Sequence, residues 1–590
     1  MPRKRGRRTD VATGTDDHPP ADVAAPEETR LRRQCDLVAA AIAVVMVVIV
    51  LWLSPTHVTW PGDEFTDMNT LMSGENFATH GFFRLKLLPV FHLGTMTDPP
   101  SYYTHYPPLT NIVNGLLRVV GVESLAVMRV FCGLLCIVGL VCMYRAFAPD
   151  MGPLGAVCGL GFIATTGFYL SYCISLHHTF NFFFMGVFFL LFTSAVRRNG
   201  RAVGIWAACW VVLLLESLTS FEFILYPQVF AWFYLFATGR LGQRWRGLIL
   251  LGTAPAIGVG LHFLQNCWAL GLSAATADAA TAFGSAGGPS SHLRWTYLSQ
   301  VPKKLLEMGK LFYFYRRWAL LAFPFAVWFW LADRKRRGPT TPRGLPTLVS
   351  ATLFGALAWF VTMPSHTVHH VHTLGQLLAL LFTAVGSALG SVVECAIRRK
   401  APLYRRVPAA ACALLVIYGQ VKTVDECLKT TSRQPPTDCR LFEALGENGL
   451  PPKTAVLSNS PMEAQLAYFI RRPLWRSPSK SLPFNAKQLA LLQNRLPDDW
   501  QLRYYIFTPA GEHAVFEPLA ENCLGYAVHM PGPGNRGYLI IFDMAPLLEP
   551  PGKRRRLTPE RRTIQLKGGF TRWESPGLAD RLKKLGAEAR

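Results

Sequence analysis

The chain contains the apolar stretch Leu37-Val-Ala-Ala-Ala-Ile-Ala-Val-Val-Met-Val-Val-Ile-Val-Leu-Trp-Leu53, and the acidic pair of Pro61-Gly-Asp-Glu-Phe65 follows shortly after it. An apolar helix of about 20 residues can cross the hydrocarbon core of a membrane, so we predict a first span over residues 35–54. Ionised groups are costly at the edge of that core, and in membrane proteins they usually mark a site for a substrate, an ion or a proton. Asp63 and Glu64 therefore direct the search for function to the first loop.

Composition places the whole chain in the membrane class. Half of the 590 residues are apolar and only 16% are charged, which is unusual for a soluble protein of this size. Testing each apolar run against the length of a membrane helix predicts eleven spans. They lie at residues 35–54, 124–146, 152–172, 178–196, 203–219, 222–239, 247–268, 316–332, 346–363, 372–396 and 406–421.

The positive charge of the chain follows its predicted topology. A formal net charge of +23 would also suit a nucleic-acid-binding protein, but the basic residues gather in four short loops between apolar runs, which is typical of cytoplasmic loops. These loops contain Arg197, Arg198 and Arg201; Arg240, Arg244 and Arg246; Arg334, Lys335, Arg336, Arg337 and Arg343; and Arg398, Arg399, Lys400, Arg405 and Arg406. With a cytoplasmic N-terminus, eleven spans place all four on the cytoplasmic side. We expect a bacterial inner membrane protein with no nucleic-acid partner.

Composition changes again at both ends of the predicted bundle. Residues 1–34 form a polar, basic head that we expect to be disordered and cytoplasmic, and residues 35–421 form the membrane module, whose first extracytoplasmic loop is 55–123. Residues 422–590 alternate strand-like runs such as Tyr538-Leu-Ile-Ile-Phe542 with helix-like stretches. We therefore predict an all-α membrane bundle followed by an extracytoplasmic α/β domain, in which a Cys427–Cys439 disulfide is permitted.

The first loop has a recognisable order of elements. The acidic pair is followed by a helix-like run to Ala78, and the loop then reaches His105-Tyr-Pro-Pro-Leu109, which leads into another helical stretch. This order resembles the first extracytoplasmic loop of GT-C glycosyltransferases, specifically the branch of the protein O-mannosyltransferases and aminoarabinose transferases. The resemblance covers the first loop in detail and the architecture to about residue 421.

The resemblance implies a chemistry for the acidic pair. In that family a sugar linked to a lipid phosphate is attacked at its anomeric carbon by an acceptor, and a carboxylate takes the acceptor's proton or orients it. Asp63 matches the family's acidic position, and Glu64 is the second candidate for the same role. Alternatively, the pair caps the helix that follows, because acidic side chains accept backbone N–H bonds at helix starts.

Glu222 is a third candidate catalytic residue. It lies in an outward turn between two predicted spans, about a turn and a half beyond Glu216, and a carboxylate at that depth usually faces a cavity or a partner. Its alternative role is an ion pair with Arg129 or with a histidine of a neighbouring helix. His177, His178 and Asn181 open the fourth predicted span on the same side, and Asn181 stands where relatives in the family often have an acidic residue.

Four histidines gather within Met363-Pro-Ser-His-Thr-Val-His-His-Val-His372. His366 and His370 are spaced to share one helix face, and neutral imidazoles bind divalent metals, so a divalent metal is possible although no cofactor is required. Pro364 argues against a helix in its first residues. We favour a role for His366, His369 and His370 in binding the donor phosphate or the acceptor, because an imidazole N–H can donate to an oxyanion. Interfacial histidines without a role are the remaining alternative.

The loop at 269–315 supplies further candidate binding residues. It begins with a small-residue stretch, Ala274 to Gly288, that we expect to be flexible, and continues as a basic amphipathic segment. Its basic residues suit a lipid phosphate, and they also suit anionic headgroups. The predicted substrate-binding residues are Arg294, Lys303 and Lys304 of this loop, with Arg316 and Arg317 as rivals for the donor phosphate, and His105 and Tyr106 of the first loop. His262, near the outer end of the seventh span, could also face the cavity.

These patterns lead to one main hypothesis and two rivals. The main one is a glycosyltransferase that moves a sugar from a polyprenyl-phosphate carrier to a lipid, glycan or protein acceptor on the extracytoplasmic face. Nucleotide-driven transport and serine hydrolysis lack their usual motifs. A transporter or lipid flippase is the first rival, although transporters usually place charges near mid-membrane. A receptor with an exported sensing domain is the second, and it leaves Asp63 without a role.

Overall fold

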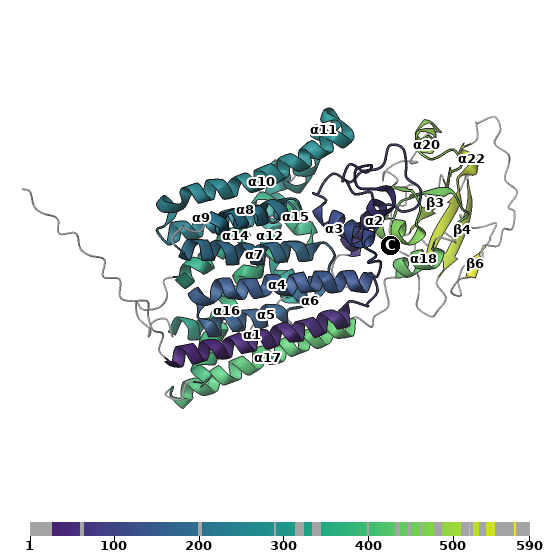
Figure 1. Cartoon of the computed structure of the whole chain (residues 1–590). Helices are drawn as coiled ribbons and strands as arrows, with labels where there is room; N and C mark the ends of the chain where they lie inside the picture. The colour runs from purple at the N-terminus through teal and green to yellow at the C-terminus, as the bar shows by residue number, and fades with distance from the viewer. Residues whose placement is uncertain are drawn as a thin grey trace, which may run out of the picture.

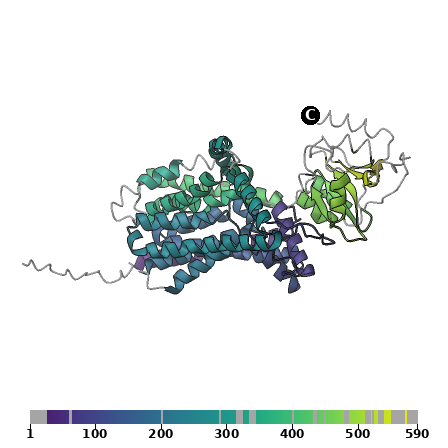
Figure 2. The same ribbon diagram turned by 90° about the horizontal axis from the view of Figure 1, so that it is seen from above.

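The computed structural model describes residues 26–59, 64–198, 203–287, 291–312, 324–332, 344–397, 401–430, 437–446, 450–460, 463–476, 486–508, 519, 523–529, 538–548 and 571–573. Within them, long helices pack side by side as a bundle, and a small sheet with its own helices lies beyond one end of it (Figure 1). Figure 2 shows the same arrangement from above. The predicted fold class, a helical membrane bundle with a C-terminal α/β unit, is confirmed.

Seven stretches of the described helices are long and apolar enough to cross a membrane. They lie in α1 (Pro26–Leu53), α4 (Leu125–Met151), α7 (His178–Arg197), α10 (Leu241–Leu270), α14 (Gly344–Thr362), the 3-10 helix η2 (Val371–Leu377) continued by α16 (Leu378–Ile397), and α17 (Leu403–Thr430). The apolar helices α5 (Pro153–Ala164) and α8 (Val203–Ser217) are shorter.

The remaining predicted spans also coincide with helices. The span at 152–172 is divided between α5 and α6 (Gly167–Tyr172), because Thr166 caps α6 by accepting a hydrogen bond from the Tyr169 N–H. The apolar block around residue 220 is divided between α8 and α9 (Leu225–Ala237). The span at 316–332 is described only over 324–332, where it is helical, so the count of eleven stays a prediction.

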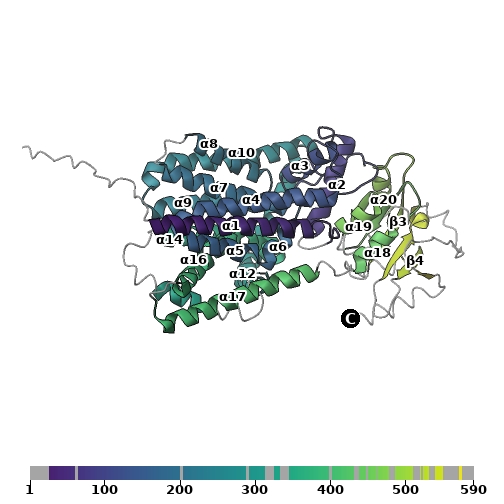
Figure 3. The ribbon, with the colours of Figure 1, turned by 60° about the horizontal axis from the view of Figure 1, so that its bottom comes forward.

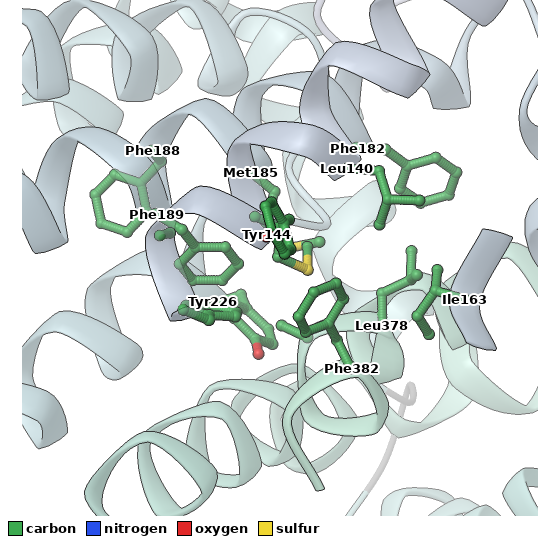
Figure 4. Packing of buried hydrophobic residues seen from close by; sticks show 14 of the residues in the cluster. Leu140, Tyr144, Ile163, Phe182, Met185, Phe188, Phe189, Tyr226, Leu378 and Phe382 are labelled. Carbon is green, nitrogen blue, oxygen red and sulfur yellow. The ribbon is translucent and has the colours of Figure 1, made fainter. Parts of the chain in front are cut away.

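The bundle core is aromatic and closely packed. Figure 4 shows Phe189, Tyr226 and Phe382 converging from three helices. Where α4 crosses α7, a Cβ on Gly186 would lie only 2.0 Å from the Gly139 carbonyl oxygen. Only glycine permits so close a backbone approach, and small residues serve this purpose between membrane helices.

The first loop folds at the end of the bundle nearest the α/β unit, which we call the domain end (Figures 1 and 3). The predicted amphipathic helix is α2 (Glu64–His80), and α3 (Leu109–Val119) follows the Pro-Pro element as expected. The stretch predicted to be flexible is instead the helix α11 (Leu272–Gly287). That prediction is wrong because most of its small residues are alanines, which favour helix, rather than glycines. The basic segment forms α12 (Ser291–Phe312).

The α/β unit contains one six-stranded mixed sheet in the order β2-β1-β3-β5-β4-β6. Its strands are β1 (Thr454–Ser458), β2 (Leu474–Arg476), β3 (Gln501–Phe507), β4 (Leu524–His529), β5 (Tyr538–Asp543) and β6 (Thr571–Trp573). Its helices are α18 (Thr437–Leu445), α19 (Glu463–Ile470), α20 (Ala486–Gln493) and α22 (Ala545–Leu548). Strand β1 is parallel to β2 and β3, and the other pairs are antiparallel. Cys427 is half-buried and Cys439 is buried, and the two are not joined in the permitted disulfide.

Charged residues join the α/β unit to the first loop. Glu75 of α2 forms ion pairs with Arg118 of α3, at 3.6 Å, and with Arg471, which follows α19. His57 and Glu443 of α18 lie 3.5 Å apart. The first loop is therefore held between the bundle and the α/β unit.

Candidate functional site

Glu222 is the centre of a buried polar cluster at the domain end. It lies in the turn between α8 and α9, and its side chain is only 4% exposed. Its Oε1 atom lies 2.9 Å from His372 Nε2 and 3.4 Å from His366 Nε2. The side-chain amide of Gln376 donates to the Glu222 backbone carbonyl at 2.6 Å. Of the two partners foreseen for Glu222, the histidines are the ones that the structure places beside it.

The first loop reaches this cluster through Tyr106. The Tyr106 hydroxyl and His366 Nε2 are hydrogen-bonded at 2.8 Å. Burial lowers the pKa of His366 to about 3, so its imidazole is neutral at pH 7. A neutral imidazole has one donor and one acceptor nitrogen. The predicted residues Tyr106, His366 and Glu222 thus form one connected network.

The histidine-rich turn is more helical than its sequence suggested. Helix α15 (Pro364–His369) begins at Pro364 itself, so the expectation of a non-helical start is wrong, because proline fits the first helical position. The exposed His370 ring stacks on His366 with ring centroids 4.3 Å apart. His369 turns elsewhere: its Nδ1 bonds to the Ser365 carbonyl at 2.8 Å, and its ring packs on Tyr297 of α12.

His105 does not join Tyr106 in the cluster. Its Nε2 lies 3.1 Å from Asp278 Oδ1 of α11, and the Thr104 hydroxyl donates to Asp278 Oδ2 at 2.7 Å. His262, which the sequence suggested as a further cavity residue, bonds through Nε2 to the Thr104 carbonyl oxygen at 2.8 Å and so supports the same segment. Nothing in the sequence marked Asp278 as a site residue, except that it is the single acidic residue in the stretch of small residues.

The ends of the segment that carries the acidic pair are anchored in the bundle. The Arg129 guanidinium donates to the carbonyls of Thr56, His57 and Val58. On the far side, Asp67 Oδ1 accepts bonds from the Ser175 hydroxyl and the Leu176 N–H, both at 2.8 Å. Burial raises the pKa of Asp67 to about 6, although the Arg129 charge opposes the shift.

The acidic pair itself is only partly described. Asp63 lies outside the described residues, together with residues 60–62, and Glu64 begins α2 without a described side chain. The choice between catalysis and helix capping for Asp63 and Glu64 therefore stays a prediction.

The predicted basic residues lie on a helix beside the histidine cluster. Helix α12 contacts α15 and η2. Arg294 is exposed, Lys304 is half-buried, and the exposed Lys303 lies 4.0 Å from Glu307. Arg316 and Arg317 lie outside the described residues.

Three residues of the cluster had no predicted function. His372 and Gln376 were not selected as site residues, and His178 was named without a role. The His372 ring stacks on His178 of α7 with centroids 4.5 Å apart, and Gln376 fixes the backbone of Glu222. The dense histidine run was the signal for His372. Gln376 gave no signal, because its partner is a backbone carbonyl about 150 residues away in sequence.

Comparison with known proteins gives the fold of the chain. No protein-family model matches it, and no curated protein matches its sequence. Among solved structures, apo ArnT from Cupriavidus metallidurans is similar with a TM-score of 0.51 at 14% identity, over 87% of this chain and 98% of ArnT. The same ArnT bound to undecaprenyl phosphate gives a TM-score of 0.47 at 14% identity, over 87% of this chain and 99% of ArnT. The apo oligosaccharyltransferase of Archaeoglobus fulgidus is similar with a TM-score of 0.49 at 13% identity, over 85% of this chain and 74% of the oligosaccharyltransferase.

The chain therefore has the fold of apo ArnT, a multi-pass membrane bundle, at low sequence identity. This agrees with the resemblance carried by the first loop. The sequence-based recognition is therefore confirmed at the level of the fold.

Proposed function

We propose that this chain is a membrane glycosyltransferase that moves a sugar from a polyprenyl-phosphate carrier to an acceptor on the extracytoplasmic face. The observation that carries the proposal is the Tyr106–His366–Glu222 network. It connects the loop that contains the acidic pair to a buried carboxylate inside a bundle with the ArnT fold. The crystallised complex of ArnT with undecaprenyl phosphate makes a polyprenyl phosphate the carrier of choice.

The reaction assigns a role to each part of the site. The acceptor oxygen or nitrogen forms a bond to the anomeric carbon of the sugar, the bond from that carbon to the carrier phosphate breaks, and the polyprenyl phosphate leaves. Asp63 takes the acceptor's proton, with Glu64 and Glu222 as the other candidate carboxylates. Tyr106 and the histidines supply hydrogen bonds to anionic oxygens, as oxyanion-stabilising donors do.

Cationic side chains complete the proposed donor site. The leaving phosphate is anionic, and charge-assisted bonds from lysine or arginine stabilise such groups. Arg294, Lys303 and Lys304 lie on α12, which packs against the histidine turn. We assign them to the donor phosphate, while His105 and His369 keep more peripheral places in the substrate site.

The test is a transfer assay with a panel of radiolabelled polyprenyl-phosphate sugars in purified membranes. Wild type is compared with Asp63→Asn and Glu222→Gln at matched expression, and the exposed Asp98→Asn of the same loop is the control. We expect transfer by wild type and Asp98→Asn, and its loss in Asp63→Asn. Transfer retained in Asp63→Asn would move the base to Glu64 or Glu222. No transfer by wild type from any donor of the panel would refute the proposal and favour a transporter.

A further inference from the structure

We propose that His366, His370, His372 and Glu222 form a binding site for one divalent cation of the zinc type. One ring nitrogen from each of the three histidines lies within 4.8 Å of the others. Imidazole nitrogen and carboxylate oxygen are the ligands that zinc takes from side chains other than cysteine. The inference concerns metal binding alone, and an ion held there would engage Glu222 and leave Asp63 and Glu64 as the candidate bases of the proposed transfer.

Two distances at Glu222 match those of a tetrahedral metal site. With zinc–ligand bonds of about 2.0–2.1 Å, neighbouring ligand atoms of a tetrahedron lie about 3.3 Å apart. Glu222 Oε1 lies 2.9 Å from His372 Nε2 and 3.4 Å from His366 Nε2. Glu222 is therefore placed to coordinate an ion together with these two histidines.

The cluster also has unused ligand capacity. Within the described part of the chain, Glu222 Oε2 and His366 Nδ1 are buried and have no hydrogen-bond partner. Buried polar atoms are normally satisfied, so orphaned atoms in a cluster call for an explanation such as a bound ion. A cation held by the Glu222 carboxylate would engage the free Oε2 atom.

The surroundings hold the ligands in place. Gln376 fixes the Glu222 backbone at 2.6 Å, and the His178 ring stacks on His372. A Cβ on Gly375 would lie 2.9 Å from the Phe182 ring and 3.0 Å from Phe223, so η2 is closely fitted against its neighbours. Supporting contacts of this kind orient metal ligands.

The ligand set indicates a structural role for the ion. Zinc sites with four protein ligands are closed and contribute to folding, whereas catalytic sites keep an open position. Here the ion would tie the turn between α14 and α16 to the turn between α8 and α9.

The experiment measures metal content in the full chain, purified in detergent with an affinity tag that contains no histidine. The protein is stripped with a chelator, given equimolar Zn²⁺ and gel-filtered, and bound zinc is counted by mass spectrometry. The variants are His370→Ala, chosen because His370 is exposed and its loss should not disturb folding, and Glu222→Gln. His369→Ala is the matched control, since its ring turns away to Ser365 and Tyr297.

We expect about one zinc per chain in wild type and in His369→Ala. In competition with a chromophoric chelator, His370→Ala should bind zinc at least tenfold more weakly, because even supporting residues of zinc sites contribute 10- to 100-fold. Zinc should also raise the Tm of wild type and of His369→Ala but not of His370→Ala. The proposal is overturned if wild type retains no zinc after gel filtration, or if His370→Ala retains it as tightly as His369→Ala.

Discussion

Tyr106 and His366 are 260 residues apart in sequence, yet the tyrosine hydroxyl and the imidazole Nε2 are hydrogen-bonded at 2.8 Å. The bond joins the first loop to the histidine-rich turn, and Glu222 lies 3.4 Å from the same ring nitrogen. A single hydroxyl therefore connects the loop that carries the acidic pair to the buried carboxylate.

Replacing Tyr106 by phenylalanine should slow sugar transfer without unfolding the protein. The change removes the hydroxyl that is hydrogen-bonded to His366 Nε2. Losing one partner of a buried hydrogen bond costs about 1–3 kcal/mol. We expect a decrease in kcat/KM of roughly tenfold or more. The measurement is the transfer assay at matched expression, with Tyr102→Phe of the same loop as the control. Equal rates in the two variants would contradict a role for this hydroxyl.

Asp67 should make the folded protein less stable as the pH rises from about 4 to 6. Burial raises its pKa from 3.8 to about 6, so in this range the folded state binds a proton that the unfolded state has released. The free energy of unfolding then falls with increasing pH, by roughly 3 kcal/mol for two pKa units. In Asp67→Asn this loss should be absent, while the amide oxygen can still accept from Ser175 and Leu176.

The measurement for Asp67 is the Tm of detergent-purified wild type and Asp67→Asn between pH 4 and 7. The Tm of Asp67→Asn relative to that of wild type should rise with pH up to about pH 6 and stay constant above it. A Tm difference that stays constant with pH would show that Asp67 does not titrate in this range.

The contribution of His92 to stability should depend on pH in the opposite sense to that of Asp67. Burial lowers its pKa from 6.5 to about 4, against a smaller opposing effect of a backbone hydrogen bond at Leu93. The unfolded state therefore binds the proton first, and stability is lost as the pH falls from about 6.5 towards 4. The Tm of wild type should therefore fall relative to that of His92→Leu as the pH decreases over this range. A Tm difference between the two proteins that stays constant with pH would show that His92 does not contribute to the acid sensitivity.

The sequence predicted the bundle because each membrane helix has to bury its own backbone polar groups in a long apolar run. The same logic placed Glu222 and the histidines at one end of the bundle. It could not show that His105 turns to Asp278 while its neighbour Tyr106 turns to His366, because that choice depends on contacts with helices far along the chain. For the same reason Asp67 had no predicted role and Arg129 was considered only as a partner of Glu222, since most of their hydrogen bonds run to distant backbone groups.

Gly94 is the residue through which the docking of the α/β unit on the first loop can be tested. Its φ is +90°, and a Cβ there would lie 2.7 Å from the Arg471 carbonyl oxygen. Gly81 has a similar φ of +88° but open space around the same position. An alanine at either residue introduces the same kind of backbone strain, so the difference between the two variants isolates the collision with Arg471.

Gly94→Ala should be less stable than Gly81→Ala by about 1–3 kcal/mol, the usual range for a forced overlap. Because Arg471 also pairs with Glu75, displacing its backbone should loosen this contact and expose the junction between α2 and α19. Limited proteolysis should therefore release the α/β unit from Gly94→Ala faster than from Gly81→Ala, and its Tm should be lower. If the two variants are cleaved at equal rates and melt together, the Gly94–Arg471 contact does not hold the α/β unit in place.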